Sequence, residues 1–219
     1  MGIRTKLRIW FGRNVKGENA PNFRSADYWD RRYRKGGNSG AGSYGRLAEF
    51  KAEILNSFVA EHGIQTIVEH GCGDGAQLDL ARYPSYLGLD VSSTIVEICR
   101  ERFKDDATKR FSVVGDEASS RYDLALSLDV IYHLVEDAVY EEYMRGLLNS
   151  SHRFVAIYAS NEDRLTNDIH VRHRRFTDTI AATNEWQLIR HIPNRYPYDR
   201  RNRGNTSFAD FYIFERATK

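Results

Sequence analysis

Three glycines follow a short apolar run in the segment 67–75, which reads IVEHGCGDG. This pattern predicts a buried strand at 66–70, a tight turn, and then a helix that contains Leu78 and Leu80. Glycine permits unusual backbone angles and, because it lacks a Cβ, lets a ligand lie against the main chain. Ligands of open α/β sheets bind at the carboxyl ends of the strands, so this turn is a candidate nucleoside site.

Carboxylates accompany the glycine turn. Asp90 ends the next predicted strand, where it can accept hydrogen bonds from two vicinal ribose hydroxyls. Glu69 stands just before the turn, and Asp116 and Glu117 follow the third predicted strand, where a carboxylate can accept a hydrogen bond from an adenine amino group. Acidic groups at all three places favour a nucleoside that carries positive charge and no phosphate. S-adenosylmethionine has this chemistry.

The glycine spacing alone does not separate this ligand from a dinucleotide, because Gly71-x-Gly73-x-x-Ala76 also satisfies the NAD fingerprint. Asp74 disfavours that alternative. A carboxylate at the start of the predicted helix would repel the pyrophosphate that a dinucleotide places there.

Three segments resemble motifs of the class I S-adenosylmethionine-dependent methyltransferases. Residues 67–75 are similar to their first motif, 86–92 (YLGLDVS) to their second, and 122–134 (YDLALSLDVIYHL) to the motif of their fourth strand. The likeness covers roughly residues 66–160 and the last two predicted strands. It implies a Rossmann-like α/β fold, with a seven-stranded, mostly parallel sheet, helices on both faces and a reversed terminal strand.

The resemblance also implies which residues bind the cofactor. The glycines approach it, and Leu128 and Asp129 border its methionine part. Tyr28, Trp29 and the glycine-rich loop 36–43 would form a lid, with core packing of the two aromatic residues as the alternative. The full set of expected cofactor-binding residues is Tyr28, Glu69, Gly71, Cys72, Gly73, Asp90, Val91, Asp116, Glu117, Leu128 and Asp129.

Methyl transfer needs the acceptor to be aligned with the methyl carbon and shielded from water, and a hydroxyl acceptor must also lose a proton. His133, just beyond the fourth predicted strand, is the expected general base, because histidine titrates near neutral pH. Asp129 would orient His133 or hold the amino group of the donor. The alternative is that His133 only caps a helix or hydrogen-bonds a loop.

A second polar cluster, DIHVRHRR at 168–175, follows the fifth predicted strand, which places it above the acceptor. Arginine binds phosphate and carboxylate well, so the cluster predicts contacts with an anionic substrate, and an exposed charged loop is the alternative. The expected substrate-binding residues are Tyr132, His170, Arg172 and His173. The two histidines and the aspartate have no diagnostic metal-ligand spacing, so no metal is expected.

The acceptor is the least specified part of the prediction. The blocks NSGAGSYGRLAEFKAEIL, HVRHRRF and SFADFYIF resemble bacterial methyltransferases associated with surface-polysaccharide genes. That resemblance implies a small molecule, sugar or anionic glycan, methylated at oxygen. The aromatic and basic stretch 195–203 can stack nucleobases, but no nucleic-acid motif accompanies it. An RNA methyltransferase and a non-catalytic cofactor-binding module remain alternatives.

The remaining pattern predicts the elements that hold these residues. Helical spacing predicts helices at 26–34, with Ser25 as its cap, and then around 47–58 and at 93–103, 136–148 and 177–184. Short apolar runs predict strands at 86–90, 111–114, 122–128, 153–158, 187–192 and 208–215, the last two as an antiparallel hairpin.

Composition limits the class of protein. In 219 residues with 41% hydrophobic side chains, no apolar run reaches the roughly 18 residues of a membrane span. Two cysteines form no disulfide framework, which suits a reducing cytoplasm. We expect residues 1–24 to form a basic arm and 25–219 one methyltransferase domain. Its parts are the N-terminal helices and lid (25–60), the cofactor-binding core (61–160), and the substrate loops and hairpin (161–219).

Overall fold

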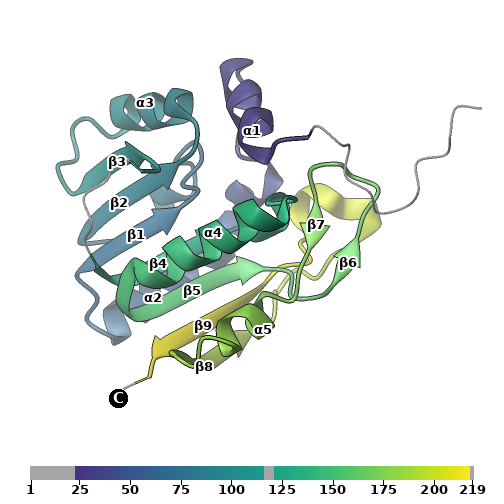
Figure 1. Cartoon of the computed structure of the whole chain (residues 1–219). Helices are drawn as coiled ribbons and strands as arrows, with labels where there is room; N and C mark the ends of the chain where they lie inside the picture. Colours follow the sequence, from purple (N-terminus) through teal and green to yellow (C-terminus); the bar gives the residue numbers. More distant parts are fainter. Residues whose placement is uncertain (1–22, 116–120, 218–219) are drawn as a thin grey trace, which may run out of the picture.

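One seven-stranded sheet organises the molecule, with strands in the order β3-β2-β1-β4-β5-β9-β8 (Figure 1). A computed structural model describes residues 23–115 and 121–217. Six strands are parallel to one another, and β9 runs the other way between β5 and β8. The expected reversed terminal strand and antiparallel hairpin are therefore confirmed. The strands are β1 (Thr66–His70), β2 (Ser85–Asp90), β3 (Lys109–Val113), β4 (Tyr122–Leu128), β5 (Ser151–Ala159), β8 (Trp186–Ile192) and β9 (Asp210–Arg216).

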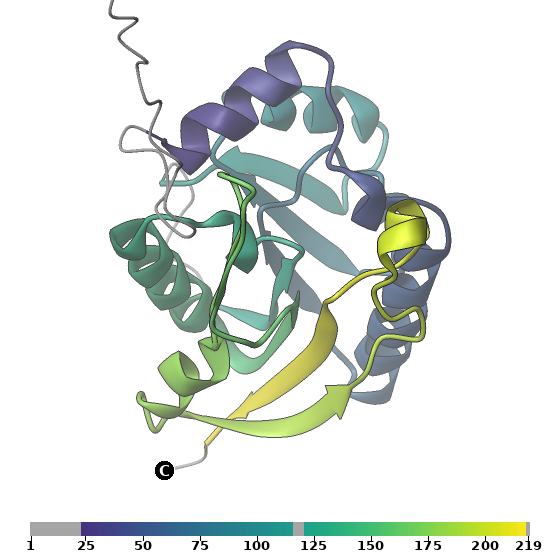
Figure 2. The same ribbon diagram turned by 90° about the vertical axis from the view of Figure 1, so that its right-hand side faces the viewer.

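Helices cover both faces of the sheet, as expected (Figure 2). On one face α2 (Gly45–Glu61) and α3 (Ser93–Arg102) pack in a core that contains Ile67 of β1. On the other face α4 (Asp137–Asn149) and α5 (Phe176–Ala181) pack in a second core that contains Val68. Because successive side chains of a strand point to opposite faces and both faces are covered, β1 and β2 are buried along almost their whole length.

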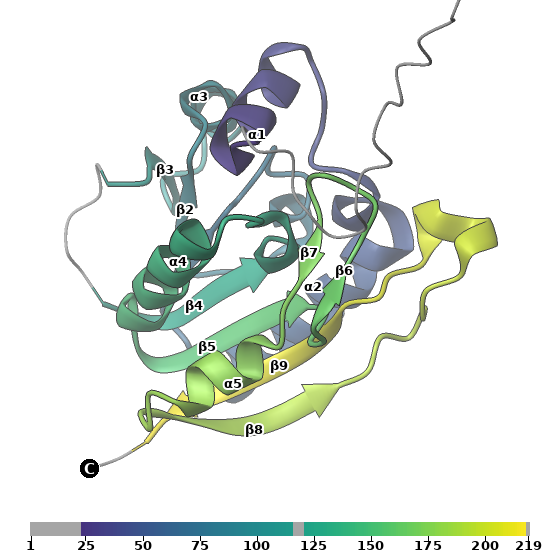
Figure 3. The ribbon, with the colours of Figure 1, turned by 45° about the vertical axis from the view of Figure 1, so that its right-hand side comes forward.

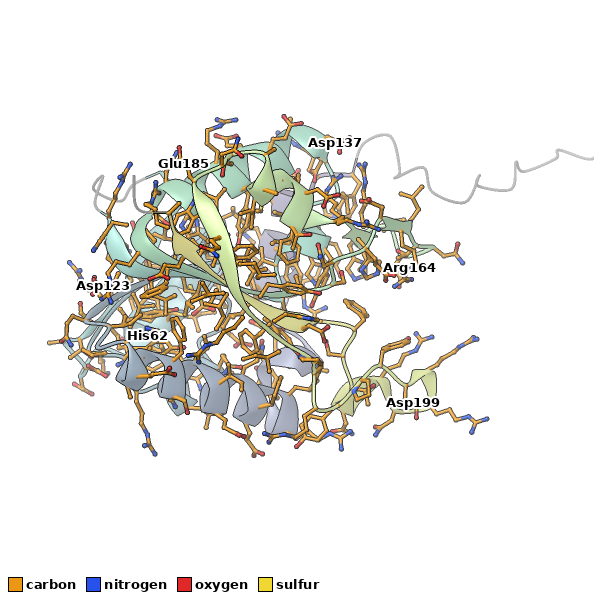
Figure 4. The ribbon with its side chains drawn as sticks, turned by 90° about the horizontal axis from the view of Figure 1, so that it is seen from below. His62, Asp123, Asp137, Arg164, Glu185 and Asp199 are labelled. Carbon is orange, nitrogen blue, oxygen red and sulfur yellow. The ribbon has the colours of Figure 1, made fainter. Side chains whose placement is uncertain are left out.

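Several segments gather beyond the carboxyl ends of the strands. Helix α1 (Ser25–Arg34) lies across this end, and the short turn η1 (Ala41–Ser43) connects it towards α2 (Figure 3). The hairpin of β6 (Arg164–Leu165) and β7 (Arg172–His173) projects from the same end. Figure 4 shows Arg164 of this hairpin and Asp199, just before η4 (Arg200–Asn205), on the side of the molecule opposite Asp123. Asp123 belongs to the amino end of β4.

The prediction of a helix after the glycine turn is wrong. Only one 3₁₀ turn, η2 (Leu78–Leu80), follows, and the chain then enters β2 at Ser85. Leu78 is buried, whereas Leu80 is 41% exposed, so the two leucines do not form the apolar stripe that stabilises a surface helix. The segment is also too short for a stable helix between Gly75 and Pro84.

Ser25 differs from its expected role as a helix cap. It is the first residue of α1, and Arg24 occupies the cap position without a side-chain hydrogen bond. Ser25 instead donates from its backbone N–H and its Oγ to the Glu136 carboxylate, at 2.8 and 2.5 Å. It therefore ties the start of α1 to the segment that leads into α4.

Candidate active site

A cavity of about 510 Å³ opens where the carboxyl ends of β1, β2 and β4 meet α1. Parallel strands bring their carboxyl ends to one edge, so residues far apart in the sequence become neighbours there. Many of the expected cofactor-binding residues line this cavity, namely Glu69, Gly71, Cys72, Gly73, Asp90, Val91, Leu128 and Asp129, together with His133.

Asp90 lies at the end of β2 and is 6% exposed. Its Oδ2 accepts a hydrogen bond from the Gly73 amide at 3.1 Å, and its Oδ1 accepts one from the Ser92 amide at 3.0 Å. Burial raises the pKa of Asp90 to about 6, although these two amides lower it. The carboxylate is thus fixed in place and has lone pairs left for ligand hydroxyls.

Glu69 provides a second buried carboxyl group in the cavity. The Tyr86 hydroxyl donates to its Oε2 at 2.7 Å. Burial raises the pKa of Glu69 to about 7, and the hydrogen bond from Tyr86 acts in the opposite direction. Glu69 therefore changes protonation near neutral pH, which makes it sensitive to a cationic ligand.

Glu69 also gives the unfolding free energy an unusual pH dependence. Between its unfolded pKa of 4.5 and its folded pKa of about 7, the folded chain holds a proton that the unfolded chain releases. We expect the wild type to gain about 2 kcal/mol from this group as the pH falls from 7.5 to 5. Urea unfolding at several pH values measures it, with Glu69→Gln as the variant that loses the gain. Parallel pH curves for the two proteins would contradict the assignment.

Helix α1 covers one side of the cavity, beyond the carboxyl ends of the strands. Asp30 accepts a hydrogen bond from Ser92 Oγ at 2.8 Å, next to Asp90, and the Trp29 ring contacts the His133 ring edge-on at 4.8 Å between centroids. Trp29 and Tyr33 line the cavity. Of the two aromatic residues expected in the lid, only Trp29 lines the cavity. Tyr28 does not line the cavity, because its ring stacks on His170 with the centroids 4.9 Å apart.

The glycine-rich loop is held to the glycine turn by Asp74. The Ser39 amide donates to Asp74 Oδ2 at 2.8 Å, and the Asp74 amide donates back to Ser39 Oγ at 2.8 Å. The Tyr44 hydroxyl donates to the same Oδ2 at 2.6 Å. Asp74 was expected to act at the start of a helix, but no helix follows and the carboxylate fastens the lid loop instead.

His133 lies in η3 (Ile131–His133) and lines the cavity. Its Nδ1 is 2.9 Å from the carbonyl oxygen of His170. A carbonyl only accepts, so Nδ1 carries the proton and Nε2 is an acceptor in the neutral ring. Burial lowers the pKa of His133 to about 4, which keeps the ring neutral at physiological pH.

Lys51 is a cavity residue that sequence reasoning missed. Its side chain is 1% exposed, and its Nζ donates to Asp129 Oδ2 at 2.7 Å. The Tyr132 hydroxyl donates to the other oxygen of Asp129 at 2.7 Å. A signal existed, because Lys51 lies four residues from both Leu47 and Leu55 on the apolar face of α2. A lysine in such a stripe needs a buried partner.

Comparisons with known proteins show which solved structures share this architecture. No family model and no curated protein sequence matches the chain. Among solved structures, it is similar to magnesium protoporphyrin IX methyltransferase from Synechocystis PCC 6803 with bound SAM, at a TM-score of 0.63 and 14% identity over 90% of this chain and 100% of that one. The N-methyltransferase NodS from Bradyrhizobium japonicum WM9, in complex with S-adenosyl-L-homocysteine, gives a TM-score of 0.64 at 13% identity over 89% and 99%. The chain has the class I methyltransferase fold.

A third neighbour with the class I methyltransferase fold has a different acceptor in its name. The small RNA methyltransferase HEN1 aligns with a TM-score of 0.54 and 18% identity over 81% of this chain and 26% of its own. At these identities the likeness establishes the fold, while acceptors differ between proteins that share it.

Two expected substrate-binding residues form hydrogen bonds or ion pairs with residues that do not line the cavity. Arg172 donates to the carbonyl of Val135 at 3.2 Å and pairs with Asp137 at 3.0 Å. His173 is 3% exposed, and its Nδ1 is 2.5 Å from Ser160 Oγ. Both residues thus fasten the β6–β7 hairpin to the body, because short hairpins need such contacts to be stable.

The other two expected substrate-binding residues also lie outside the cavity lining. The Tyr132 side chain is buried against Phe208, with ring centroids 5.0 Å apart. It contacts the cavity lining through its hydrogen bond to Asp129 and through its ring, 4.6 Å from that of His133 between centroids. His170 lies next to His133 and contributes its carbonyl to that ring. None of the four expected substrate-binding residues therefore lines the cavity, and their contacts with an acceptor stay a prediction.

Some expectations fall outside what the structure describes. Asp116 and Glu117, expected near adenine, and most of the basic arm at 1–24 lie outside the described residues. Within 23–115 and 121–217, no cluster of three or more His, Cys, Asp or Glu side chains could hold a metal ion. None of the helices described is long and apolar enough to cross a membrane.

Proposed function

We propose that this protein is an S-adenosylmethionine-dependent methyltransferase in the cytoplasm. It transfers methyl to oxygen of a small molecule, sugar or anionic glycan, as in polysaccharide modification. One observation carries the proposal: Glu69, Asp90 and Asp129 converge from three strands on a single cavity that the glycine turn also lines. Titratable groups shifted by burial and gathered in one cavity are typical of functional sites.

The residues of the cavity fit this cofactor. Gly71 has φ of +81°, and a Cβ there would come within 2.6 Å of Val130, so the turn that lines the cavity requires glycine at this position. Asp90 would hold the ribose hydroxyls, and Val91 and Val114 offer apolar contacts beside it. The acidic lining complements a positively charged sulfonium, which supplies an activated methyl group when the cofactor is bound.

His133 supports transfer to oxygen. His133 lines the cavity, and its unprotonated Nε2 would accept the proton of a hydroxyl bound there. Trp29 packs edge-on against the His133 ring, and Trp29 and Tyr33 of α1 would shield this part of the cavity from water. The low pKa of about 4 makes His133 a weak base, so alignment of the acceptor contributes most of the acceleration.

Two measurements test the proposed function. Calorimetry with S-adenosylmethionine, S-adenosylhomocysteine and NAD measures the cofactor preference directly. Transfer of tritiated methyl into fractionated nucleotide sugars, polysaccharide and RNA identifies the acceptor class. Binding of NAD in preference to S-adenosylmethionine would overturn the assignment, and binding without transfer to any fraction would indicate a non-catalytic module.

Replacing His133 with Ala should lower kcat for an oxygen acceptor by about 10²–10⁴-fold, because the proton acceptor is lost. Affinity for S-adenosylmethionine should change little, since the expected contacts of His133 are with the acceptor. Single-turnover methyl transfer and calorimetry measure the two effects separately. His191→Ala is the matched control, because His191 lies far from the cavity and pairs with Asp210. Unchanged turnover in His133→Ala would remove the base.

RNA is the second candidate acceptor. The η4 loop exposes Arg200, Arg201 and Arg203 beside the exposed ring of Tyr198, and η4 packs against η1 of the lid loop. Arginine and aromatic side chains together can bind single-stranded nucleic acid. Binding that weakens steeply as salt rises from 50 to 200 mM would favour RNA, whereas weak salt dependence favours a small acceptor.

A further inference from the structure

The cavity contains one buried cation among many acids. Lys51 is the only lysine or arginine among its described lining residues, whereas Glu69, Asp90, Asp129 and Glu142 are acidic. A ligand with an anionic group would meet repulsion everywhere except at Lys51. The position of this ammonium therefore fixes where such a group can bind.

The ammonium of Lys51 retains capacity for a ligand. An ammonium has three donors, and within the described parts of the chain Nζ makes one hydrogen bond, to Asp129 Oδ2. The ring of Tyr158 lies 5.3 Å from Nζ and shields one side of it. Buried charges are stabilised when their remaining donors are also satisfied, so a second acceptor at this place would be favourable.

The position of Lys51 is rigidly determined. Asp129 has a φ of +62°, which is unusual for an aspartate, and its second oxygen is held by the Tyr132 hydroxyl. The backbone of Gly42 in the lid loop lies so close to this carboxylate that a Cβ would come within 2.6 Å of Oδ2. Strand β4, helix α2 and the lid loop thus converge on one ion pair at the wall of the cavity.

We propose that Lys51 binds a ligand carboxylate, and that this is the carboxylate at the amino-acid end of the cofactor. The inference rests on the proposed function and adds the group that recognises that end. The Lys51–Asp129 pair is neutral overall, and an α-amino carboxylate is neutral as well. A ligand carboxylate at Lys51 and a ligand ammonium nearer Asp129 leave no unpaired charge in the buried site.

Decarboxylated S-adenosylmethionine tests the proposal because it differs from the cofactor only by the carboxylate. The wild type should bind S-adenosylmethionine about 10–100-fold more tightly than the decarboxylated compound, the range of a hydrogen bond to a charged group. Lys51→Met combined with Asp129→Asn should bind both compounds equally, and Lys51→Arg should keep part of the preference. The double variant avoids a lone buried charge, and Lys104→Met is the surface control, since Lys104 pairs with Glu101 in an exposed position.

The other source of a carboxylate is the acceptor, and a second titration distinguishes it. Protein saturated with S-adenosylhomocysteine is titrated with glucuronate and with glucose. A preference for glucuronate that disappears in the Lys51 variants, with equal binding of the two cofactors, assigns the carboxylate to the acceptor and overturns the cofactor assignment. No Lys51 dependence in either titration overturns carboxylate binding altogether. Failure of the wild type to bind S-adenosylmethionine at all would instead reject the proposed function. The comparison of the two cofactors on the wild type needs no variant to fold.

Discussion

Asp90→Asn should bind S-adenosylmethionine about 100-fold more weakly than the wild type, with little loss of folding stability. The carboxylate has the position and the free lone pairs to accept two ribose hydroxyls, and hydrogen bonds to a charged group contribute about 1.5–3 kcal/mol each. The amide is neutral, and one of its ends donates where the carboxylate accepts. Calorimetry at pH 7.5 measures the affinity, and thermal unfolding monitors the fold.

The pH dependence of binding gives an independent check on Asp90. Its pKa of about 6 in the free protein means that the carboxyl group takes up a proton below pH 6. Hydroxyl donors favour the ionised form, so wild-type affinity should fall as the pH drops from 7 to 5, by up to tenfold per unit. Asp90→Asn should have a smaller slope, with the remainder coming from Glu69. Asp79→Asn is the control, since Asp79 is exposed and pairs with Arg102. Wild-type affinity in Asp90→Asn would exclude ribose binding at this residue.

Gly73→Ala should lose most cofactor affinity because the substitution combines backbone strain with a collision. Gly73 has φ of +56°, and an added Cβ would clash with Ser39 Oγ. Ser39 would then move, which breaks its reciprocal hydrogen bonds with Asp74 and loosens the lid loop. We expect at least a tenfold loss of affinity for S-adenosylmethionine and faster proteolysis within residues 36–44.

Gly63→Ala is a closely matched control for Gly73→Ala. Gly63 has a nearly identical φ of +59°, but a Cβ there meets nothing within 4 Å. It ends α2, far from the cavity, so its replacement should cost about 1 kcal/mol of stability and leave binding unchanged. If both alanine variants bind the cofactor equally well, contact between the glycine turn and the lid loop has no role in binding.

The sheet could be predicted because its signals are local. The buried runs of β1 and β4 are predicted to the residue, since continuous apolar segments bounded by turn residues are typical of strands covered on both faces. The absence of a helix after the glycine turn could not be predicted from local signals. Whether Leu78 and Leu80 both reach the core depends on the path of the chain in space, and only Leu78 does.

The position of part of the candidate site could also be predicted from local signals in the sequence. Asp90 and the glycines occupy positions that the order of strands dictates, so their placement follows from the fold. Arg172 and His173 were expected to face a substrate, but their partners Asp137 and Ser160 come from elsewhere in the chain. Contacts between side chains that are far apart in the sequence leave no local pattern from which they could be predicted. Lys51 was missed because its partner Asp129 lies 78 residues away.

The short turn at Leu78–Leu80 affects which adenine compounds can compete for the cavity. A full helix at this place would point several free amide groups and its positive end at the glycine turn, which attracts a phosphate chain. Here no such helix follows, the amides of the glycine turn donate to Leu89, Asp90 and Ser39, and the neighbouring wall carries Glu69 and Asp90. ATP and NAD would therefore have to bury several negative charges against carboxylates. The protein can thus discriminate against abundant cellular nucleotides through a shortened backbone element, without a side chain dedicated to that task.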